Sequence, residues 1–576
     1  MKIIDMVSTL ANNFSIIEMK EVVATLAKFH RIQGSDELRY AAEYIYNTLR
    51  QLSTFDVRKH VFSYGESYGL HDPVAGWNLS KCEAEVIEPT HILLSSFLYT
   101  KNCAVAHSPP GTVEGEVIYV GKGDNESLLN EDKVRNKIVL SYGNPYIVYT
   151  RFSKAGAIGF LFYKRGINDS ATPYLSLFLT PAEASNYTAP AVAIPRKNAN
   201  KILSYLERGE KVVVRIDVES KFVSNADIVV VEASLNDNDY AEEMHIFAHY
   251  CHPSHEINDN VSGAATLIET VLSLDRLISK GYIKHIAKKG ISFLWFPEYY
   301  GTLPFLMKRV LDEKKYISFG INLDMIGEKQ EITKSTLNLV LPPYFISNPV
   351  YESLITKILI DVLSTNNPSF NKVANIIRYR FDILPYEGGS DHDIYLQFSI
   401  PSVMLNQWPD IYYHTDEDDI HKLDFEIAKA IGTSIGVFSW IVLADLPKES
   451  FLDAYKSFRN GYSRLKLCDT NSNLQVESFG DNHNEKYVYV GPKGVLSLRY
   501  IMRRLHNKLE EIMKLTEDDF TNFLLTRYIP LLLMIKPRTI DEIREGIWNE
   551  YCKDVDPRTL WKIINILKEL NLVKPI

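Results

Sequence analysis

The stretch MHIFAHYCHPSHEINDNVSGAATLIETVLSLDRLI, residues 244–278, decides the fold. It opens with an apolar, strand-like run at 244–249 and continues into a helical pattern over 261–278. Further strand-like runs follow at 291–296, ISFLWF, and at 319–327, FGINLDMIG. Strands that alternate with helices are typical of an α/β fold with a largely parallel sheet. We therefore predict such a core.

The segments on either side of these runs extend the core. Residues 1–60 carry apolar side chains at helical spacing, with Ser35 as the N-cap of a second helix after a turn. A long apolar helical pattern covers residues 425–446. We expect the core domain to comprise residues 1–84 and 221–450.

Residues 85–220 have a different sequence pattern. Short β-like runs are separated by Gly, Pro and Asn, among them GEVIYVG (115–121), KIVLSY (137–142) and KVVVRIDV (211–218). This pattern predicts a separate, small, β-rich domain that is inserted into the core domain.

The chain changes again after residue 450. Residues 451–500 are predicted to be a linker, rich in Asn, Gly and Ser over 470–487, with a short β segment. Residues 501–576 contain three helical stretches. Thr539 and Glu542 predict a capping box at the second, and Asp556-Pro557 predicts an N-cap with Pro at the first position of the third. This pattern indicates a winged-helix-like domain.

Composition bounds the class of protein. The chain has 576 residues, of which 46% are hydrophobic and 23% charged, so it is globular and too long for one core. Its net charge of −9 disfavours a general nucleic-acid or membrane-surface binder. No apolar run approaches the roughly 20 residues that span a bilayer, and the N-terminus lacks the apolar region of a signal peptide.

The cysteines indicate the compartment. Their number is 5, and they are scattered, without a spacing that suggests pairs. This pattern fits a reducing cytosol better than a disulfide framework. We therefore expect unpaired cysteines and a cytoplasmic location.

Ionisable residues accompany three of the strand-like runs. His249 ends the first, Glu298 follows the second, and Asp324 lies within the third. Sites in open α/β sheets form outside the carboxyl ends of the strands, so these side chains should meet in one crevice. Asp259, before the helix, and His414, in a polar loop, are further candidates.

Each residue also has a simpler interpretation. A strand-end histidine is usually a surface or hydrogen-bonded residue, and Asp259 could cap the following helix. The joint pattern is harder to explain in this way, because Glu298 and Asp324 adjoin strongly apolar runs and a buried carboxylate needs a partner. Mixed His and carboxylate ligands suit Zn²⁺, with Co²⁺ or Mn²⁺ as alternatives.

Several motifs carry a resemblance to a known family. They are AHYCHPSHEINDNVSGAATLIETV, LWFPEYYG, INLDMIG, GGSDHDIYLQFSIPSVML and YYHTDEDD. In order and spacing they resemble the M28 family of metallopeptidases. The resemblance covers roughly residues 20–450 and implies a zinc-peptidase core with helices on both faces. The inserted region is similar to a protease-associated (PA) domain, through KIVLSY, SKAGAIGFLFYKR and APAVAIP.

The resemblance implies a role for each candidate. His249 and Asp324 would bind one metal ion, and His414 would bind a second. Asp259 would bridge the two ions. Glu298 matches the first Glu of the family's Glu-Glu pair, which is the general base that takes a proton from the attacking water and passes it to the leaving amine.

Two positions depart from the family pattern. Cys251 stands in place of the Asp of His-x-Asp and is either a soft ligand or a residue behind the ligands. Tyr299 replaces the second Glu, which is a metal ligand. Three interpretations are open: one metal with Glu298 as base, Glu298 as a ligand, or a substitute ligand. Candidates for the substitute are His252, Asp391 and His392. We favour a single metal ion.

The leading hypothesis is a zinc-dependent exopeptidase, an aminopeptidase acting on peptide or amino-acyl substrates, with the inserted domain as a lid or filter. One alternative is a catalytically weak or inactive binding or regulatory protein of the same fold that uses the winged helix. Another is an amidohydrolase of a non-peptide amide. The near-neutral last helix gives weak support for phosphate contacts, so we favour protein docking over nucleic acid there. We expect no membrane partner, and a homo-oligomer stays open.

Overall fold

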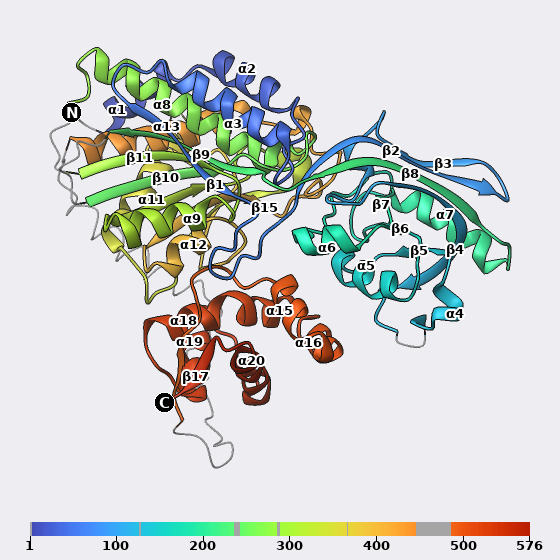
Figure 1. Ribbon diagram of the computed structural model, residues 1–576. Coiled ribbons are helices and arrows are strands. Elements are labelled where there is room, and N and C mark those ends of the chain that lie inside the picture. The colour runs from blue at the N-terminus through green and yellow to red at the C-terminus, as the bar shows by residue number, and fades with distance from the viewer. Residues whose placement is uncertain (1–2, 126–127, 236–241, 285–288, 366, 445–484) are drawn as a thin grey trace.

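The computed structural model describes residues 3–125, 128–235, 242–284, 289–365, 367–444 and 485–576. Figure 1 shows a central body of sheet and helices, a second sheet body to its right, and a helical body below at the C-terminus. The chain forms the central body both before and after the second body, which is therefore an insertion.

The central body is built on an eight-stranded sheet. In spatial order its strands are β1 (Asp56–Ser63), β9 (Asp227–Leu235), β11 (Lys289–Phe296), β10 (Glu242–His249), β12 (Tyr316–Leu323), β15 (Ser402–Trp408), β13 (Thr336–Val340) and β14 (Phe381–Leu384). The strands from β11 to β15 are parallel, whereas β1, β9 and β13 join by antiparallel pairs. The α/β core predicted from the sequence is confirmed. The prediction of helix throughout 1–60 is wrong at β1, whose residues all pair with β9 at the sheet edge.

Helices cover both faces of this sheet, as predicted (Figure 1). One face carries α1 (Ile3–Asn13), α2 (Ile16–Leu26), α3 (Asp36–Leu49), α8 (Gly263–Ser279), α11 (Pro349–Ser364) and α13 (Phe425–Leu443). The other carries α9 (Thr302–Leu306) and α12 (His392–Gln397). Side chains alternate between the two cores: Ile246 packs on the first side and Phe247 on the second. Ser35 caps α3, accepting the N–H of Leu38 at 3.0 Å, as predicted.

The inserted body contains a seven-stranded sheet. In spatial order its strands are β3 (Ile92–Ser96), β2 (Gly76–Glu88), β8 (Val213–Val223), β4 (Gly111–Gly121), β5 (Lys137–Ser141), β6 (Gly159–Phe162) and β7 (Ala191–Ala193). Its helices are α4 (Glu131–Val134), α5 (Pro145–Lys154), α6 (Pro181–Asn186) and α7 (Arg196–Glu207). The long antiparallel pair β2–β8 leads out of the central body and back (Figure 1). Its likeness to a PA domain stays a prediction.

Cysteines in this structure are mostly paired. Cys82 and Cys103 form a disulfide in the inserted body, and Cys552 is disulfide-bonded too. The prediction of unpaired cysteines is wrong for these residues, because folding brings together positions whose sequence spacing indicates no pair. Cys251 is a buried free thiol, and Cys468 lies outside the described residues. Disulfides are typical of oxidising compartments or of hyperthermophiles, so the predicted cytoplasmic location loses the support that it drew from the cysteines.

The C-terminal body is helical with a small sheet. It contains α15 (Leu498–Arg504), α16 (Leu509–Leu515), α17 (Asp519–Phe523), α18 (Ile529–Ile535), α19 (Ile540–Tyr551), α20 (Pro557–Glu569) and the antiparallel strands β16 (Tyr487–Tyr489) and β17 (Val573–Pro575). The Thr539–Glu542 capping box and the Asp556 cap are present as predicted. Helices α15 and α16 were not predicted. Most of the predicted linker lies outside the described residues, and the winged-helix assignment stays a prediction.

One helix among the described residues, α13, is long and apolar enough to cross a membrane, with a mean hydropathy of 1.4. From the sequence we expected an apolar helix over residues 425–446 but no run long enough to span a bilayer. Within the fold 83% of the window is buried, since α13 packs against α8 and α11. This burial is that of a core helix.

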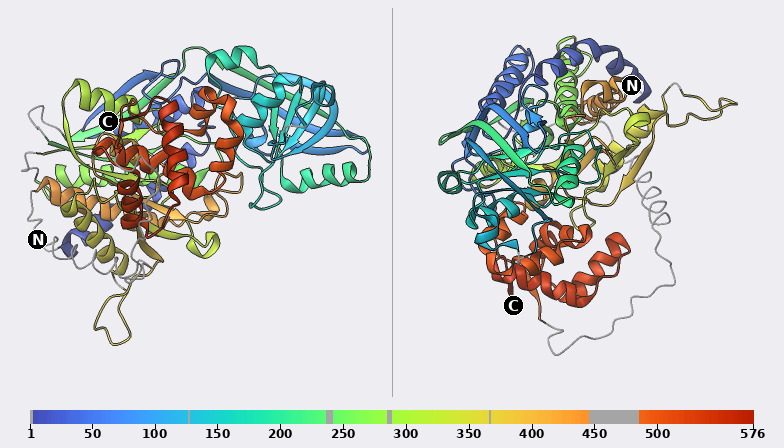
Figure 2. Two further views of the ribbon diagram at one scale, coloured as in Figure 1. Left: turned by 90° about the horizontal axis from the view of Figure 1, so that it is seen from below. Right: turned by 90° about the vertical axis from the view of Figure 1, so that its right-hand side faces the viewer.

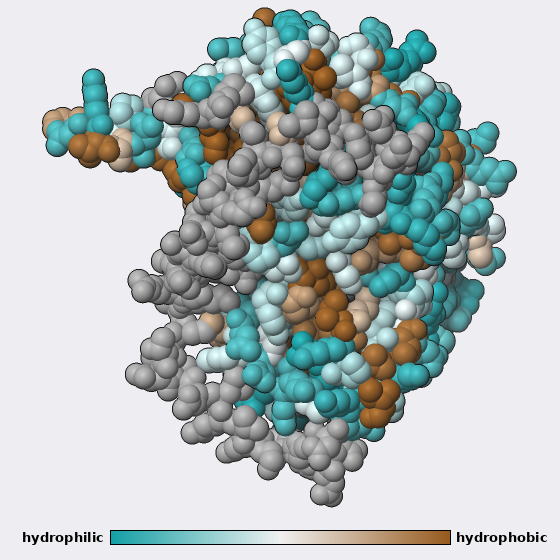
Figure 3. Space-filling view, turned by 90° about the vertical axis from the view of Figure 1, so that its left-hand side faces the viewer, coloured by the Kyte–Doolittle hydropathy of each residue, from teal (hydrophilic) through white to brown (hydrophobic). Residues whose placement is uncertain are grey.

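A loop at residues 367–380 projects from the central body (Figure 2). Its apolar side chains are exposed: Phe370 is 100% accessible and Val373 85%. Figure 3 shows the projection with hydrophobic patches, clear of the surface around it. Exposed apolar side chains of this kind often mark contact sites, and the homo-oligomer that the sequence left open stays open.

Candidate active site

The candidate site lies at the carboxyl end of the central sheet. His249 is the last residue of β10, Asp324 directly follows β12, and Glu298 comes shortly after β11. Both neighbours of β10 run parallel to it, so the three side chains leave one edge of the sheet, as predicted. His249 Nε2 lies 3.1 Å from Asp324 Oδ1 and 3.4 Å from Asp259 Oδ1.

Asp259 reaches these strand ends through the segment Ile257–Ser262, which precedes α8. The carboxylate of Asp418 accepts the backbone N–H of Asp259 at 3.3 Å. The next residue, Asn260, follows a cis peptide bond, and its Oδ1 accepts the N–H of Met325 at 3.1 Å. These bonds fix Asp259 beside the end of β12.

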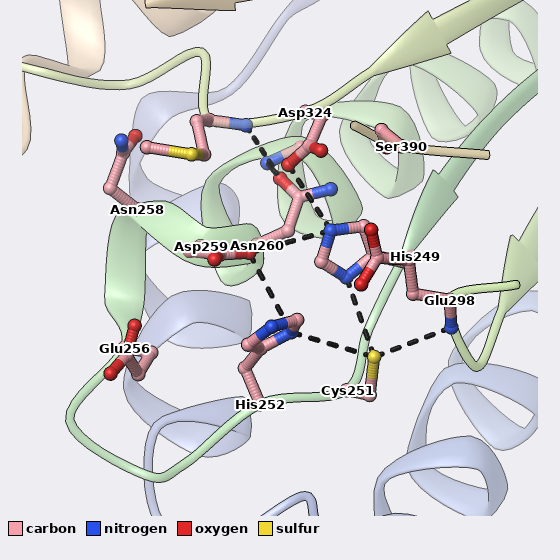
Figure 4. Close-up of polar contacts among 12 residues, drawn as sticks. His249, Cys251, His252, Glu256, Asn258, Asp259, Asn260, Glu298, Asp324 and Ser390 are labelled. Carbon is pink, nitrogen blue, oxygen red and sulfur yellow. Dashed lines mark hydrogen bonds and ion pairs between the residues drawn. The ribbon is translucent and has the colours of Figure 1, made fainter. Parts of the chain in front are cut away.

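Two groups of potential metal ligands share the Asp259 carboxylate, and Figure 4 labels all of their members except His414. We call His249, Asp259 and Asp324 the strand group, and His252, Asp259 and His414 the loop group. Within each group the ligand atoms lie within 4.8 Å of one another. Asp259 faces His249 through Oδ1 and lies 3.1 Å from His414 Nε2 through Oδ2. One carboxylate can therefore serve both groups.

Arg31 holds the loop that carries His252. The N–H of His252 donates to the Arg31 carbonyl at 2.8 Å. The Arg31 guanidinium donates to the carbonyls of Tyr250, at 2.9 Å, and Glu256, at 3.0 Å. Burial lowers the pKa of Arg31 to about 10, so it stays charged at neutral pH. Arg31 was not among the candidates from the sequence, where its only signal is its place in the motif FHRIQGS.

Cys251 lies behind the ligands. Its Sγ is 3.6 Å from His249 Nδ1 and accepts the N–H of Glu298 at 3.3 Å. Burial raises the pKa of Cys251 to about 11, so the thiol is neutral at neutral pH. It contacts the ring nitrogen of His249 that does not face the carboxylates. Cys251 also forms a third cluster with His249, His252 and Glu298, but a neutral thiol here orients His249 and is a poor ligand.

The protonation of these groups fits a cation site. Burial lowers the pKa of His252 and of His414 to about 3, so both rings are neutral, which is the form that binds metal. Burial lowers the pKa of His249, but Asp324, Cys251 and Glu298 together outweigh it and raise that pKa well above its usual value. Burial raises the pKa of Asp259. A divalent cation would relieve this crowding of buried carboxylates, and the His and Asp donors suit zinc.

Comparison with known families identifies the core. Residues 229–438 match the family model "Peptidase family M28". The chain contains an M28 peptidase domain. This match spans the strand ends that carry both ligand groups and Glu298. A search of curated proteins finds no match to the chain.

Solved structures share the fold of the M28 domain at low identity. BSAP, a zinc aminopeptidase from Bacillus subtilis, is similar with a TM-score of 0.53 at 19% identity, over 76% of this chain and 97% of that chain. A peptidase M28 precursor from Shewanella amazonensis SB2B gives 0.55 at 15% identity, over 77% and 97%. A candidate peptidase from Clostridium acetobutylicum gives 0.50 at 14% identity, over 99% and 98%. The last similarity extends over all three bodies.

Tyr299 of the M28 domain bonds to acidic residues outside the two ligand groups. Its N–H donates to Asp391 Oδ1 at 2.7 Å, and its hydroxyl donates to Asp393 Oδ2 at 3.1 Å. Arg527 of the C-terminal body bonds the same Asp393 oxygen at 2.8 Å. Burial raises the pKa of Tyr299 well above its usual value, so the phenol stays neutral. Tyr299 therefore is no metal ligand here, and it lies where the central body contacts Arg527 of the C-terminal body through Asp393.

The substitute ligands expected from the sequence differ in where they lie. Among the described residues, neither Asp391 nor His392 belongs to a potential metal group. Asp391 accepts the hydroxyl of Thr302 at 2.6 Å, and His392 Nε2 lies 2.8 Å from the carbonyl of Glu387. His252 is the candidate that joins Asp259 and His414.

Two cavities open from the site. The first, of about 480 Å³, is lined among others by Asp324, Met325, Glu387, Met404 and Trp408. The second, of about 350 Å³, is lined among others by Gln33, Tyr174, Ser176, Phe178, Tyr300 and Arg499. We call them the acidic cavity and the arginine cavity. Both are also lined by His252, Glu298, Tyr299 and His414, so the Glu298 carboxyl lies where they meet.

The inserted body reaches the site through Tyr174. Its N–H donates to the carbonyl of His414 at 2.8 Å. Its ring centre lies 5.2 Å from that of His414 and 5.5 Å from that of His252. The expected lid or filter position of the insertion thus corresponds to a direct contact with the loop group.

Proposed function

We propose that this protein is a zinc-dependent aminopeptidase that removes the first residue of a peptide. One observation carries the proposal: a buried carboxylate, Asp259, shared by two ligand groups beside Glu298, where two cavities meet. Groups of three N and O donors are typical of catalytic zinc sites, with Co²⁺ or Mn²⁺ as alternatives.

The proposal includes two metal ions, one in each ligand group. His252 would take the place of the family ligand that Tyr299 replaces. This differs from the single ion favoured by the sequence alone. Two observations support the second ion. The ligand atoms of His252, Asp259 and His414 lie within 4.8 Å of one another, and the imidazoles of His252 and His414 are neutral.

Zinc bound here would polarise the scissile carbonyl and lower the pKa of a water molecule. Glu298 acts as the base: its carboxylate accepts a proton from the attacking water and delivers it to the leaving amine nitrogen. Burial and the nearby carboxylates of Asp391, Asp324 and Asp259 raise the pKa of Glu298 well above its usual value. Cations bound by Asp259 and Asp324 would oppose this effect and favour the carboxylate form that the base requires. Cys251 and Asp324 hold the His249 ring from opposite sides.

The acidic cavity suits the first residue of the substrate. Glu387 provides a carboxylate for the α-ammonium group, and it lines the cavity together with Met325, Met404 and Trp408. These three side chains form an apolar wall for a side chain such as that of leucine.

The test uses the full-length protein, loaded with Zn²⁺, Co²⁺ or Mn²⁺ after metal analysis. Leucyl-alanyl-alanine is compared with its N-acetylated form, and release of the first residue is measured. We expect the acetylated peptide to react at least about tenfold more slowly, because it lacks the ammonium charge. Equal cleavage would refute an aminopeptidase. Cleavage of non-peptide amides alone would favour the amidohydrolase, and a chain that binds no metal would favour the binding or regulatory protein.

A further inference from the structure

The arginine cavity contains a cation without an anionic partner. Arg499, on α15, is half-buried at its wall. Its Nη2 donates to the hydroxyl of Ser176 at 3.3 Å, and its guanidinium lies 4.4 Å from the centre of the Phe178 ring. No ion pair joins Arg499 to a carboxylate in the part of the chain that the structure describes.

Neighbouring arginines of the same body are paired. Arg503, one turn along α15, contacts Asp72 at 3.0 Å and Glu183 at 2.8 Å. Arg527, at the acidic cavity, contacts Asp393 at 2.8 Å. A guanidinium removed from water without a counter-ion is costly, so an unpaired one facing a cavity points to an anionic ligand.

The two cavities differ in charge on either side of Glu298. In the acidic cavity, bound metal ions would offset the charges of Asp259 and Asp324, and Arg527 is paired with Asp393, so Glu387 remains as the free carboxylate of the lining besides Glu298. The arginine cavity has Glu298 as its one carboxylate among the lining residues, and Arg499 as its cation. A bound peptide has the opposite polarity: a positive amino end and a negative carboxyl end. A peptide with its amino end towards Glu387 and its carboxyl end towards Arg499 would match this difference.

We propose that the protein hydrolyses short peptides, dipeptides above all, and that Arg499 binds the C-terminal carboxylate of the substrate. This inference rests on the proposed function and adds the substrate class. A guanidinium presents parallel N–H donors that match a carboxylate. A cavity of about 350 Å³ has the size of a small-ligand site, which suits the residue or two that follow the scissile bond.

The aromatic walls limit the length of the substrate. Tyr174 and Phe178 come from the inserted body, and Tyr300 follows β11. The rings of Phe178 and Tyr300 stack at 6.1 Å, and Arg499 covers the Phe178 ring. Three bodies therefore enclose the carboxyl end of the substrate, so longer peptides should be poorer substrates.

The experiment compares leucyl-alanine with leucyl-alanine amide on the zinc-loaded, full-length enzyme, with leucine release as the readout. These substrates differ only in the terminal carboxylate. For the wild type we expect a kcat/KM ratio of acid to amide of about tenfold to a hundredfold, from the loss of a charge-assisted bond. In Arg499→Ala the ratio falls towards one, mainly through KM for the acid. Arg499→Lys keeps the positive charge but loses the parallel N–H donors of the guanidinium, so it should give an intermediate ratio.

Arg504→Ala is the matched control. Arg504 lies on the same helix, and its guanidinium pairs with Asp72 at 2.8 Å without lining the cavity. We expect this variant to keep the wild-type ratio. Thermal unfolding of each variant separates misfolding from lost recognition.

Two outcomes would overturn the inference while leaving the aminopeptidase intact. In the first, the wild type cleaves acid and amide equally well. In the second, Arg499→Ala lowers kcat/KM for both substrates by the same factor, which is the signature of a structural role. If the wild type releases leucine from no peptide with any metal, the proposed function fails and this inference fails with it.

Discussion

The strand group and the loop group differ in how the fold holds them. His249 and Asp324 leave the ends of paired, parallel strands in the middle of a sheet. The ligands that complete the loop group, His252 and His414, lie on loops, and both have positive φ angles of 94° and 55°. Exposure separates the groups only at their extremes: the His249 side chain is 1% exposed and that of His414 is 24%, whereas Asp324 and His252 are both 10% exposed.

The loop group depends on parts of the chain that lie far away in the sequence. Arg31 accepts the N–H of His252 through its carbonyl, and Tyr174 of the inserted body bonds the carbonyl of His414. The strand group needs neither contact. A rigid half and an adjustable half thus share one carboxylate, and we expect the rigid half to bind its ion more tightly, because preorganised ligands lose less entropy on binding.

The largest effect should come from Glu298, which serves both halves. Glu298→Gln keeps the shape but removes the base, so we expect kcat to fall by about 10²–10⁴-fold. Bound zinc, measured by mass spectrometry, should stay at the wild-type level, since Glu298 belongs to neither group. Full activity in this variant would show that the proton goes elsewhere.

Removal of one ligand from each half tests the comparison directly. We expect His252→Ala to lose one equivalent of zinc, keep the other at wild-type affinity, and lose about 10–100-fold in kcat/KM. His249→Ala should weaken the tighter ion instead. His255→Ala, on the same loop but in no ligand group, is the control. Equal zinc loss in all three variants would indicate general damage to the loop.

Metal removal should separate the halves in the unaltered protein. Titration of the zinc-loaded enzyme with a chelator should release zinc in two steps, the first from the loop group. Activity should fall in that first step, while most of the thermal stabilisation by zinc should be lost in the second, since tighter binding stabilises more. A single cooperative release would contradict the division into two halves.

The smallest effect concerns support for the loop that carries Asp259. Glu328 is 1% exposed, and its Oε1 accepts the side-chain N–H of Asn258 at 2.9 Å. Burial, with Asp410 beside it, raises the pKa of Glu328 from 4.5 to about 11. The folded state therefore keeps a proton that the unfolded state releases above its ordinary pKa, so stability is full at acidic pH and falls as pH rises towards 11.

Glu328→Gln replaces this protonated acid by a neutral amide of the same shape. We expect it to raise the free energy of unfolding at pH 8 by about 1–3 kcal/mol, with little change at pH 4.5, as measured by thermal unfolding at the two pH values. Glu331→Gln, at an exposed position nearby, should leave the free energy of unfolding unchanged at both pH values. A larger gain at pH 4.5 than at pH 8 would contradict the assignment.

The strand group was predictable from the sequence, and the loop group was so only in part. Strand ends are visible as apolar runs that stop at His249, Glu298 and Asp324, and parallel pairing brings such ends together. His252 was one of several substitutes, because no local pattern says which way a loop side chain turns. Arg31 gave no chemical signal, since its role is to bond backbone carbonyls more than 200 residues away in the sequence.

For the fold too, the sequence predicted local features but not contacts between distant segments. Caps at Ser35 and Thr539 are local and were predicted from neighbouring residues. The Cys82–Cys103 disulfide and the approach of α15 to the crevice depend on contacts between distant segments, which periodicity does not encode. Strand β1 was taken for helix because pairing with β9, a partner far along the chain, decides its conformation.

The walls of the crevice come from both ends of the chain, from Gln33 to Arg527. On the ribosome, both ligand groups, which end at His414, are made before Arg499 and Arg527 exist. A growing chain can therefore bring its metal ligands together while one wall of the crevice is still missing. If Arg499 binds the carboxyl end of the substrate as proposed, recognition of that end is acquired after the metal ligands and is lost if a protease removes the C-terminal body.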